Sequence, residues 1–227
     1  MACAAIIFDM DGLMIDSEPL WHQAETLAFA KVNVTLVHQD LLDVTGLRID
    51  EVVEVNYQKY NWDETLLTRA QVTTDIVDTM ESLLTEKAAT IKKPGLDQAL
   101  SFFKSKNLPI GVASSSPMRL IVAALQGLQL ENYFDAVVSA EKEKLGKPYP
   151  GVYLTAAAQL QVDASRCLAL EDSLNGTLAA KAARMKCISI PEGAEADRSL
   201  GFHIADVQLQ SLEEINASLW SRLYPGE

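Results

Sequence analysis

Two aspartates stand one residue apart near the start of the chain, in the stretch FDMDGLMIDSEP that begins at Phe8. Asp9 and Asp11 follow the short apolar run 4–8, which suits a strand that is buried on both faces. Both carboxylates are therefore expected in the loop where this strand ends. Because like charges this close repel each other, the pair indicates a cation between them, a proton that they share, or simple solvation.

Three further groups of polar residues follow predicted strands and precede predicted helices. These groups are Ser114-Ser115-Ser116, Lys147 between Gly146 and Pro148, and Glu171-Asp172. Hydroxyls and free N–H groups at a helix start can bind an anion, although serines there are also ordinary helix caps. A lone lysine is usually solvated, and acidic residues before a helix are often only caps. A role of these residues in binding or catalysis is better supported if all the groups lie at one place in the fold.

Apolar strand-like runs alternate with helical patterns from residue 92 onward. The runs cover 110–113, 136–138, 167–170 and 187–190, and the helical patterns cover 95–106, 117–128, 150–161 and 173–184. Together with the run 4–8, this alternation predicts the α/β class. The expected architecture is a Rossmann-like parallel sheet of five strands with helices on both faces.

Such sheets bind ligands beyond the carboxyl ends of their strands, and all the polar groups fall at that edge. The edge would therefore bring the carboxylates of Asp9, Asp11, Glu171 and Asp172 together with serine hydroxyls and the ammonium group of Lys147. Oxygen ligands suit Mg²⁺, which commonly bridges a carboxylate and a phosphate. Since no histidine or cysteine joins these groups, zinc and thiolate-bound metals do not fit.

The stretch between the first strand and the repeating array has no convincing strand. Helical patterns occur at 20–31, 48–60 and 63–88, and Asp63 is a candidate N-cap of the last of these. A structureless loop of this length is uncommon, so an all-helical insertion is the economical explanation. The sequence predicts a core domain made of residues 1–16 and 93–227, with a helical cap domain at 17–92.

The composition limits what the protein can bind. A net charge of −12 disfavours attraction to nucleic acid or to an anionic membrane surface. The three cysteines lack metal-ligand spacing, which favours reduced core thiols. The sequence shows neither an apolar run of about 20 residues nor the pattern of a signal peptide. We expect a cytoplasmic monomer that binds a small molecule, without a nucleic-acid or membrane partner.

The motifs DMDG, VASSSP, GKP and ALEDSLNG, in this order and with a helical insertion after the first, resemble the haloacid dehalogenase superfamily of aspartate-dependent phosphohydrolases. The resemblance covers nearly the whole chain. The stretches DGLMIDSEPLW, TGLRIDEVV and KAARMKCISIP are most similar to the sugar-phosphate phosphatases, a group that includes 2-deoxyglucose-6-phosphate phosphatase and hexitol phosphatase. β-Phosphoglucomutase is a close cousin of this group.

The resemblance implies a role for each aspartate. Asp9 would attack phosphorus and become an aspartyl phosphate. Asp11 would protonate the leaving sugar oxygen and then activate the water that hydrolyses the intermediate. Mg²⁺ would be held by the Asp9 carboxylate, the Asp11 backbone carbonyl and Asp172, with Glu171 ligating through water or orienting the other ligands.

The resemblance also implies how the substrate is held. Ser114, the Ser115 backbone N–H and Lys147 would bind the phosphoryl oxygens. The insertion would close over the site on hinges near 15–17 and 92–94. On the cap, Trp21 is a candidate substrate contact or a packing residue. Arg48 is a candidate substrate contact or a solvated residue at a helix start.

The expected activity is that of a Mg²⁺-dependent phosphatase of small sugar phosphates or sugar-alcohol phosphates, such as 2-deoxyglucose 6-phosphate. The first alternative is phosphoryl transfer of the β-phosphoglucomutase type. Trp21 stands where that enzyme has a histidine, which favours hydrolysis. The second alternative is a regulator that binds phosphate without turning it over.

Overall fold

A parallel sheet forms the centre of the computed structural model, which describes residues 2–191 and 201–226. Its six strands lie in the order β3-β2-β1-β4-β5-β6. Their bounds are Ala5–Phe8 for β1, Ile110–Ser114 for β2, Ala136–Ser139 for β3, Cys167–Glu171 for β4, Lys186–Ser189 for β5 and Val207–Gln208 for β6. The predicted α/β class is confirmed. The prediction of five strands omitted β6, because two residues are too short to show a periodic pattern.

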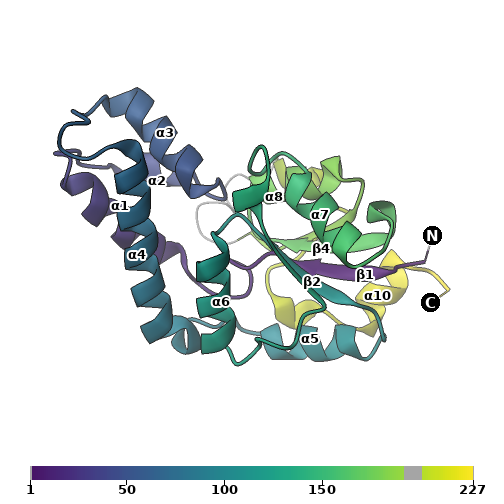
Figure 1. Ribbon diagram of the computed structural model, residues 1–227. Helices are drawn as coiled ribbons and strands as arrows, with labels where there is room; N and C mark the ends of the chain where they lie inside the picture. The colour runs from purple at the N-terminus through teal and green to yellow at the C-terminus, as the bar shows by residue number, and fades with distance from the viewer. Residues whose placement is uncertain (1, 192–200, 227) are drawn as a thin grey trace.

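Both faces of the sheet are covered by helices, as Figure 1 shows. The covering helices are α5 Leu96–Lys104, α6 Met118–Gly127, α7 Gly151–Gln159, α8 Leu174–Ala182 and α10 Ala217–Leu223. Because side chains alternate along a strand, Ile6 and Phe8 of β1 join the core cluster that includes α5, α6 and α10. Ala5 and Ile7 join the cluster with α7 and α8. All four side chains are fully buried, which fits a central strand.

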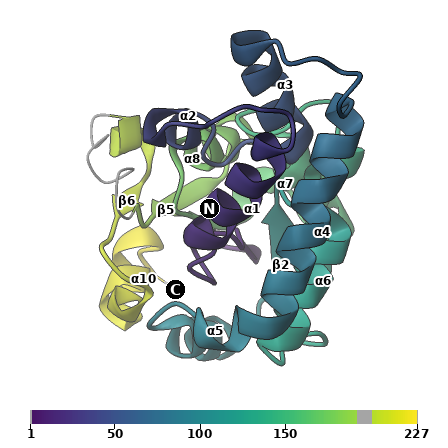
Figure 2. The same ribbon diagram turned by 90° about the vertical axis from the view of Figure 1, so that its left-hand side faces the viewer.

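The segment between β1 and α5 forms helices, as predicted. They are α1 Glu18–Ala30, α2 His38–Asp43, α3 Ile49–Tyr60 and α4 Arg69–Lys87. In Figure 1 these helices lie together at one end of the molecule, beyond the carboxyl ends of the central strands, and Figure 2 looks onto that end. Within the described part of the chain, no helix has both the length and the apolar character needed to cross a membrane.

The start of α4 differs from the prediction. The expected N-cap at Asp63 is wrong, because the helix begins at Arg69 and its N-cap is Thr68. The Thr68 hydroxyl accepts a hydrogen bond from the Gln71 backbone, and the Gln71 side chain accepts one from the Thr68 backbone. This reciprocal pair is a capping box, whereas the Asp63 carboxylate accepts from the backbone of Thr65 in a separate turn.

The two chain segments that join the insertion to the sheet run side by side. Ile15 and Lys92 form an isolated antiparallel bridge. The Asp16 N–H donates to the Ile91 carbonyl at 2.8 Å, and the Lys93 N–H donates to the Met14 carbonyl at 2.9 Å. The insertion is therefore tied to the sheet through a short two-stranded connection.

Candidate active site

The four polar groups that the sequence singles out meet at the carboxyl edge of the sheet, around one cavity. Its lining from the sheet side includes Asp9, Asp11, Ser115, Ser116, Lys147 and Asp172. The insertion contributes the opposite side, which includes Trp21, His22, Glu25, Leu41, Val44, Ile49 and Val52. A molecule in this cavity would contact charged residues on one side and a largely apolar surface on the other.

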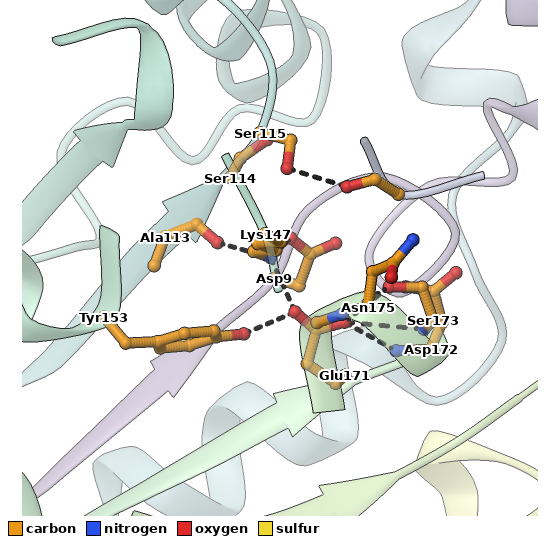
Figure 3. A network of polar contacts seen from close by, with 12 residues as sticks. Asp9, Ala113, Ser114, Ser115, Lys147, Tyr153, Glu171, Asp172, Ser173 and Asn175 are labelled. Carbon is orange, nitrogen blue, oxygen red and sulfur yellow. Dashed lines mark hydrogen bonds and ion pairs between the residues drawn. The ribbon is translucent and has the colours of Figure 1, made fainter. Parts of the chain in front are cut away.

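Lys147 lies at the centre of the polar side of the cavity and is 2% exposed (Figure 3). Its ammonium group donates to Asp9 Oδ1 and Glu171 Oε1, both at 2.5 Å, and to the Ala113 carbonyl at 3.1 Å. Burial alone lowers the pKa of Lys147, but the charges of Asp9 and Glu171 outweigh this effect and hold the pKa above its ordinary value. Lys147 therefore remains a fixed positive charge beside Asp9.

Glu171 has protein donors on both carboxylate oxygens. Tyr153 donates its hydroxyl to Oε1 at 2.5 Å, in addition to Lys147. On the other oxygen, Oε2 accepts from the backbone of Asp172 at 3.2 Å and from the backbone and hydroxyl of Ser173 at 3.4 and 3.3 Å. With its oxygens engaged in this way, Glu171 is suited to orient Lys147 and the neighbouring backbone.

Asp9, Glu171 and Asp172 form an acidic cluster in which one oxygen from each residue lies within 4.8 Å of the others. Burial raises the pKa of Asp9 well above its ordinary value, and although Lys147 opposes this, Glu171 and Asp11 add to the rise. Burial likewise raises the pKa of Asp172, and the charges of Asp9 and Glu171 reinforce the effect. This concentration of negative charge favours binding of a cation through oxygen ligands.

Gly12 lets the chain turn directly after Asp11, close to the side chain of Asp172. Its φ of +75° is strained for residues with a side chain. A Cβ atom at this position would also lie 2.0 Å from Asp172 Oδ2. Gly12 therefore meets two requirements at once, a left-handed turn and space for the carboxylate of Asp172.

Four side-chain donors converge on Asp11. Its Oδ1 accepts from the Ser17 hydroxyl at 2.7 Å and from the Trp21 indole at 3.0 Å. Its Oδ2 accepts from the Ser116 hydroxyl at 2.8 Å and from the Ser114 hydroxyl at 3.3 Å. The first pair of donors comes from the start of the insertion and the second from the end of β2, so Asp11 lies where the two parts of the molecule meet.

The serines that follow β2 have different surroundings. Ser114 is fully buried, and its hydroxyl accepts from the Ser116 backbone at 3.0 Å. Ser115 lines the cavity and donates its hydroxyl to the Gly46 carbonyl of the insertion at 3.0 Å. Ser115 and Ser116 are therefore the members of this group that a ligand in the cavity would contact first.

The two candidate contacts on the insertion have different positions. Trp21 lines the cavity and also donates to Asp11. Arg48 lies outside the cavity lining, and its Nη1 donates to the backbone carbonyls of Ala140 at 3.2 Å and Glu143 at 2.8 Å. In this arrangement Arg48 joins the insertion to the sheet domain and is not part of the cavity lining.

Sequence reasoning missed several residues that contact this site or line its cavity, among them Ser17, Tyr153 and Glu25. Ser17 and Tyr153 carry no pattern that reveals their contacts, which depend on how distant segments meet in the fold. Glu25 does leave a signal, because it is an acidic residue one helical turn after Trp21 and one turn before the apolar Phe29 on the predicted helix.

Comparison with known proteins identifies the family. A family model described as haloacid dehalogenase-like hydrolase matches residues 3–184. The chain is also similar to hexitol phosphatase B from Escherichia coli strain K12. The two are 43% identical over 214 residues, which cover 94% of each chain.

Two solved structures have a similar fold. A mutant of CbbY from Rhodobacter sphaeroides, in complex with xylulose-(1,5)bisphosphate, matches with a TM-score of 0.85 and 25% identity, covering 94% of this chain and 96% of that one. β-Phosphoglucomutase from Clostridium difficile matches with a TM-score of 0.84 and 23% identity, covering 97% and 96%. At this identity the similarity to the mutase concerns the fold alone. The family match over most of the chain shows that this protein is an enzyme that belongs to the haloacid dehalogenase-like hydrolases.

Proposed function

We propose that this enzyme is a Mg²⁺-dependent phosphatase of small sugar phosphates or sugar-alcohol phosphates that works through an aspartyl-phosphate intermediate. The observation that carries the proposal is the position of Asp9. Its carboxylate lies at the end of β1, held by Lys147 at 2.5 Å and lining the same cavity as Asp11. A nucleophile and a candidate proton donor thus lie at one strand end, as nucleophilic phosphoryl transfer requires.

Asp9 is the proposed nucleophile. Lys147 binds its Oδ1, whereas its Oδ2 accepts no hydrogen bond from the described residues. Attack by this free oxygen forms a bond to phosphorus while the bond from phosphorus to the sugar oxygen breaks. Asp11 gives its proton to the departing oxygen. It then takes a proton from the water that attacks phosphorus, which releases inorganic phosphate and restores Asp9.

Lys147 and the serines at the end of β2 are proposed to bind the phosphoryl group. A carboxylate and a phosphate dianion repel each other, so positive charge and hydrogen-bond donors must offset the repulsion. Lys147 supplies the charge and lines the cavity. The Ser114 hydroxyl, the Ser115 backbone N–H and Ser116, which lines the cavity, are the candidate donors.

The acidic cluster fits a divalent cation such as Mg²⁺, because its ligand atoms are all oxygens. Asp9, Asp172 and the Asp11 backbone carbonyl would hold the ion, with Glu171 orienting its neighbours. When bound, the ion would offset the charge of the phosphoryl group and orient its oxygens. The protein would supply the nucleophile and move the protons.

The substrate class follows from the relatives and the cavity. The name of hexitol phosphatase B indicates that its substrate is a sugar-alcohol phosphate, and that protein is 43% identical to this chain. Among the described residues that line the cavity, Lys147 is the only lysine or arginine. One phosphoryl group can therefore be compensated, whereas a bisphosphate would leave its second phosphate without a strong cation. This difference favours hydrolysis of a monophosphate over a mutase reaction.

Residues 17–92 are proposed to act as a cap that moves relative to the core formed by 1–16 and 93–227. The proposed hinges are near 15–17 and 92–94, where residues 14–16 pair with residues 91–93. Closing the cap would exclude water and bring Trp21 and Ser17 to Asp11. The proton donor would then be fully positioned only when the site is closed.

Release of inorganic phosphate from hexitol 6-phosphates and hexose 6-phosphates tests the proposal. We expect release in the presence of Mg²⁺ and loss of activity with a chelator. Release that does not depend on metal, or no release from any phosphomonoester, contradicts it. Conversion of β-glucose 1-phosphate to glucose 6-phosphate without free phosphate, followed by NMR, would instead support the mutase alternative.

A further inference from the structure

Glu25 is a carboxylic acid in the apolar side of the cavity. It lies on α1, lines the cavity and is 5% exposed. The other insertion residues around the cavity include Leu41, Val44, Ile49 and Val52, none of which can form a side-chain hydrogen bond. An acidic group in such surroundings loses most of its hydration.

The carboxyl group has no partner in the described part of the protein. Its Oε2 is buried and accepts no hydrogen bond. A buried polar atom without a partner costs about 1–3 kcal/mol, which a leucine at the same position would avoid. Packing of α1 therefore does not account for a carboxyl group here, whereas a ligand in the cavity would give a partner to the other oxygen, Oε1, which also has no hydrogen bond among the described residues.

The surroundings determine which kind of ligand group fits. Burial raises the pKa of Glu25 to about 8, so the group is mostly protonated at neutral pH and can both donate and accept a hydrogen bond. Asp16, Glu18 and His22 also line the cavity at the start of the insertion, and Asp11 lies on the sheet side. A hydroxyl matches a neutral donor and acceptor, whereas a second anion would find no cation on this side.

We propose that Glu25 is a specificity-determining residue that exchanges hydrogen bonds with a hydroxyl of the substrate's leaving group. The proposal deepens the proposed function and rests on it. Asp9 and Lys147 mark the position of the phosphoryl group, and the esterified alcohol extends from there toward the insertion. Glu25 would then select polyhydroxylated alcohols over alkyl chains of the same length.

Two esters with equal carbon chains measure this selection: sorbitol 6-phosphate and hexyl phosphate, which lacks the hydroxyls. The readout is the ratio of their kcat/KM values in Glu25→Leu, Glu25→Gln and the unaltered enzyme. We expect Glu25→Leu to lower the ratio about 10- to 100-fold, because the hydroxyl loses its partner. Glu25→Gln keeps a neutral donor and acceptor, so its ratio should stay within about fivefold of the original.

Gln23→Leu is the matched control, because it makes a similar polar-to-apolar change on an exposed position of the same helix. Its ratio should equal that of the unaltered enzyme. An unchanged ratio in Glu25→Leu, or an equal loss for both esters, overturns the proposal. The melting temperature of Glu25→Leu shows that the variant folds, and removal of the unpartnered carboxyl should raise it.

Binding separates a failure of this inference from a failure of the proposed function. If the unaltered enzyme releases phosphate from neither ester and from no hexose 6-phosphate, the proposed function is wrong. Calorimetric titration of Asp9→Asn with sorbitol 6-phosphate, with and without Glu25→Leu, then still decides the role of Glu25. We expect Glu25→Leu to weaken binding about 10-fold or more, and equal affinities would contradict the inference.

Discussion

At the residue scale, the proposal depends most on Asp9, whose side chain is buried beside Lys147. Asp9→Asn keeps the shape of the side chain and an acceptor for Lys147, but an amide cannot attack phosphorus. We expect kcat to fall about 10⁴-fold or more, measured as phosphate release. Circular dichroism should show an intact fold. Asp75→Asn, at an exposed ion pair of the insertion, is the control and should keep full activity.

The raised pKa of Glu25 predicts how the stability of the protein depends on pH. Its pKa rises from 4.5 to about 8 on folding because of burial. The folded protein therefore holds this proton more tightly than the unfolded chain does. The resulting stabilisation is complete below about pH 4.5 and is lost as the pH rises toward about 8.

Glu25→Gln stays neutral throughout this range and should remove that part of the pH dependence. Between pH 5 and 8.5, the free energy of unfolding of the unaltered protein should fall by about 3–5 kcal/mol relative to the variant. Urea titrations of both proteins at several pH values measure the difference. All other titrating groups are present in both proteins. If the free energies of unfolding of the two proteins changed in parallel with pH, the pKa of Glu25 would not be raised by folding.

Which site residues the sequence could predict depends on where their partners lie. That Asp9, Lys147 and Asp172 lie around one cavity could be predicted because each follows a strand of one parallel sheet, and such ends share an edge. Tyr153 could not, since its contact with Glu171 depends on how α7 packs against the sheet. The position of Arg48 likewise depends on how closely the insertion approaches the sheet domain.

At the scale of elements, the contacts of Gly176 near the start of α8 predict an effect of its replacement by alanine that is opposite to the effect expected from helix propensity. Alanine normally favours a helix over glycine by about 1 kcal/mol. A Cβ on Gly176, however, would lie 1.9 Å from Glu171 Oε1, which Lys147 and Tyr153 hold in place. Gly176→Ala should therefore destabilise the protein and lower kcat about 10-fold or more through displacement of Glu171.

Gly151 at the start of α7 offers a matched control. Its Cβ would lie 2.4 Å from Glu143 Oε2, the end of a flexible side chain that can move aside. Gly151→Ala should leave kcat near that of the unaltered enzyme. Thermal melting and phosphate release measure both variants, and equal behaviour of the two would show that Glu171 is not confined by Gly176.

Arg48 links the insertion to the sheet domain through two backbone carbonyls. Its removal should make closure less favourable, because two hydrogen bonds from a charged donor to the sheet domain are lost. We expect Arg48→Ala to raise KM about 5- to 30-fold. Arg69→Ala removes exposed pairs with Glu54 and Glu64 within the insertion, so its KM should not change.

Secondary structure could be predicted where the apolar pattern is long and regular. The first five strands agree with the predicted runs to within one residue at each end, because each is buried. Helix α2 was missed, since its six residues span less than two turns. The predicted N-cap of α4, Asp63, lies five residues before the observed one, because the capping box at Thr68 outweighs the isolated Asp63.

At the scale of the whole molecule, the negative charge of the protein predicts that a bound cation stabilises the fold. The chain carries a net charge of −12, and three of its carboxylates crowd around one edge of the sheet. A divalent cation that binds there stabilises the folded state by about 2.7 kcal/mol at 100 times its dissociation constant. For a chain of this size we expect Mg²⁺ to raise the melting temperature by about 5–10 °C.

Asp172→Asn distinguishes binding at this cluster from general screening of charge. Without Mg²⁺ the variant should melt at a higher temperature than the unaltered protein, because it removes one of three mutually repelling carboxylates. With Mg²⁺ it should gain little further stability, since a ligand is missing. Sodium chloride at equal ionic strength should not reproduce the shift in the unaltered protein. If it does, or if Asp172→Asn gains as much from Mg²⁺ as the unaltered protein, the cluster does not hold the ion.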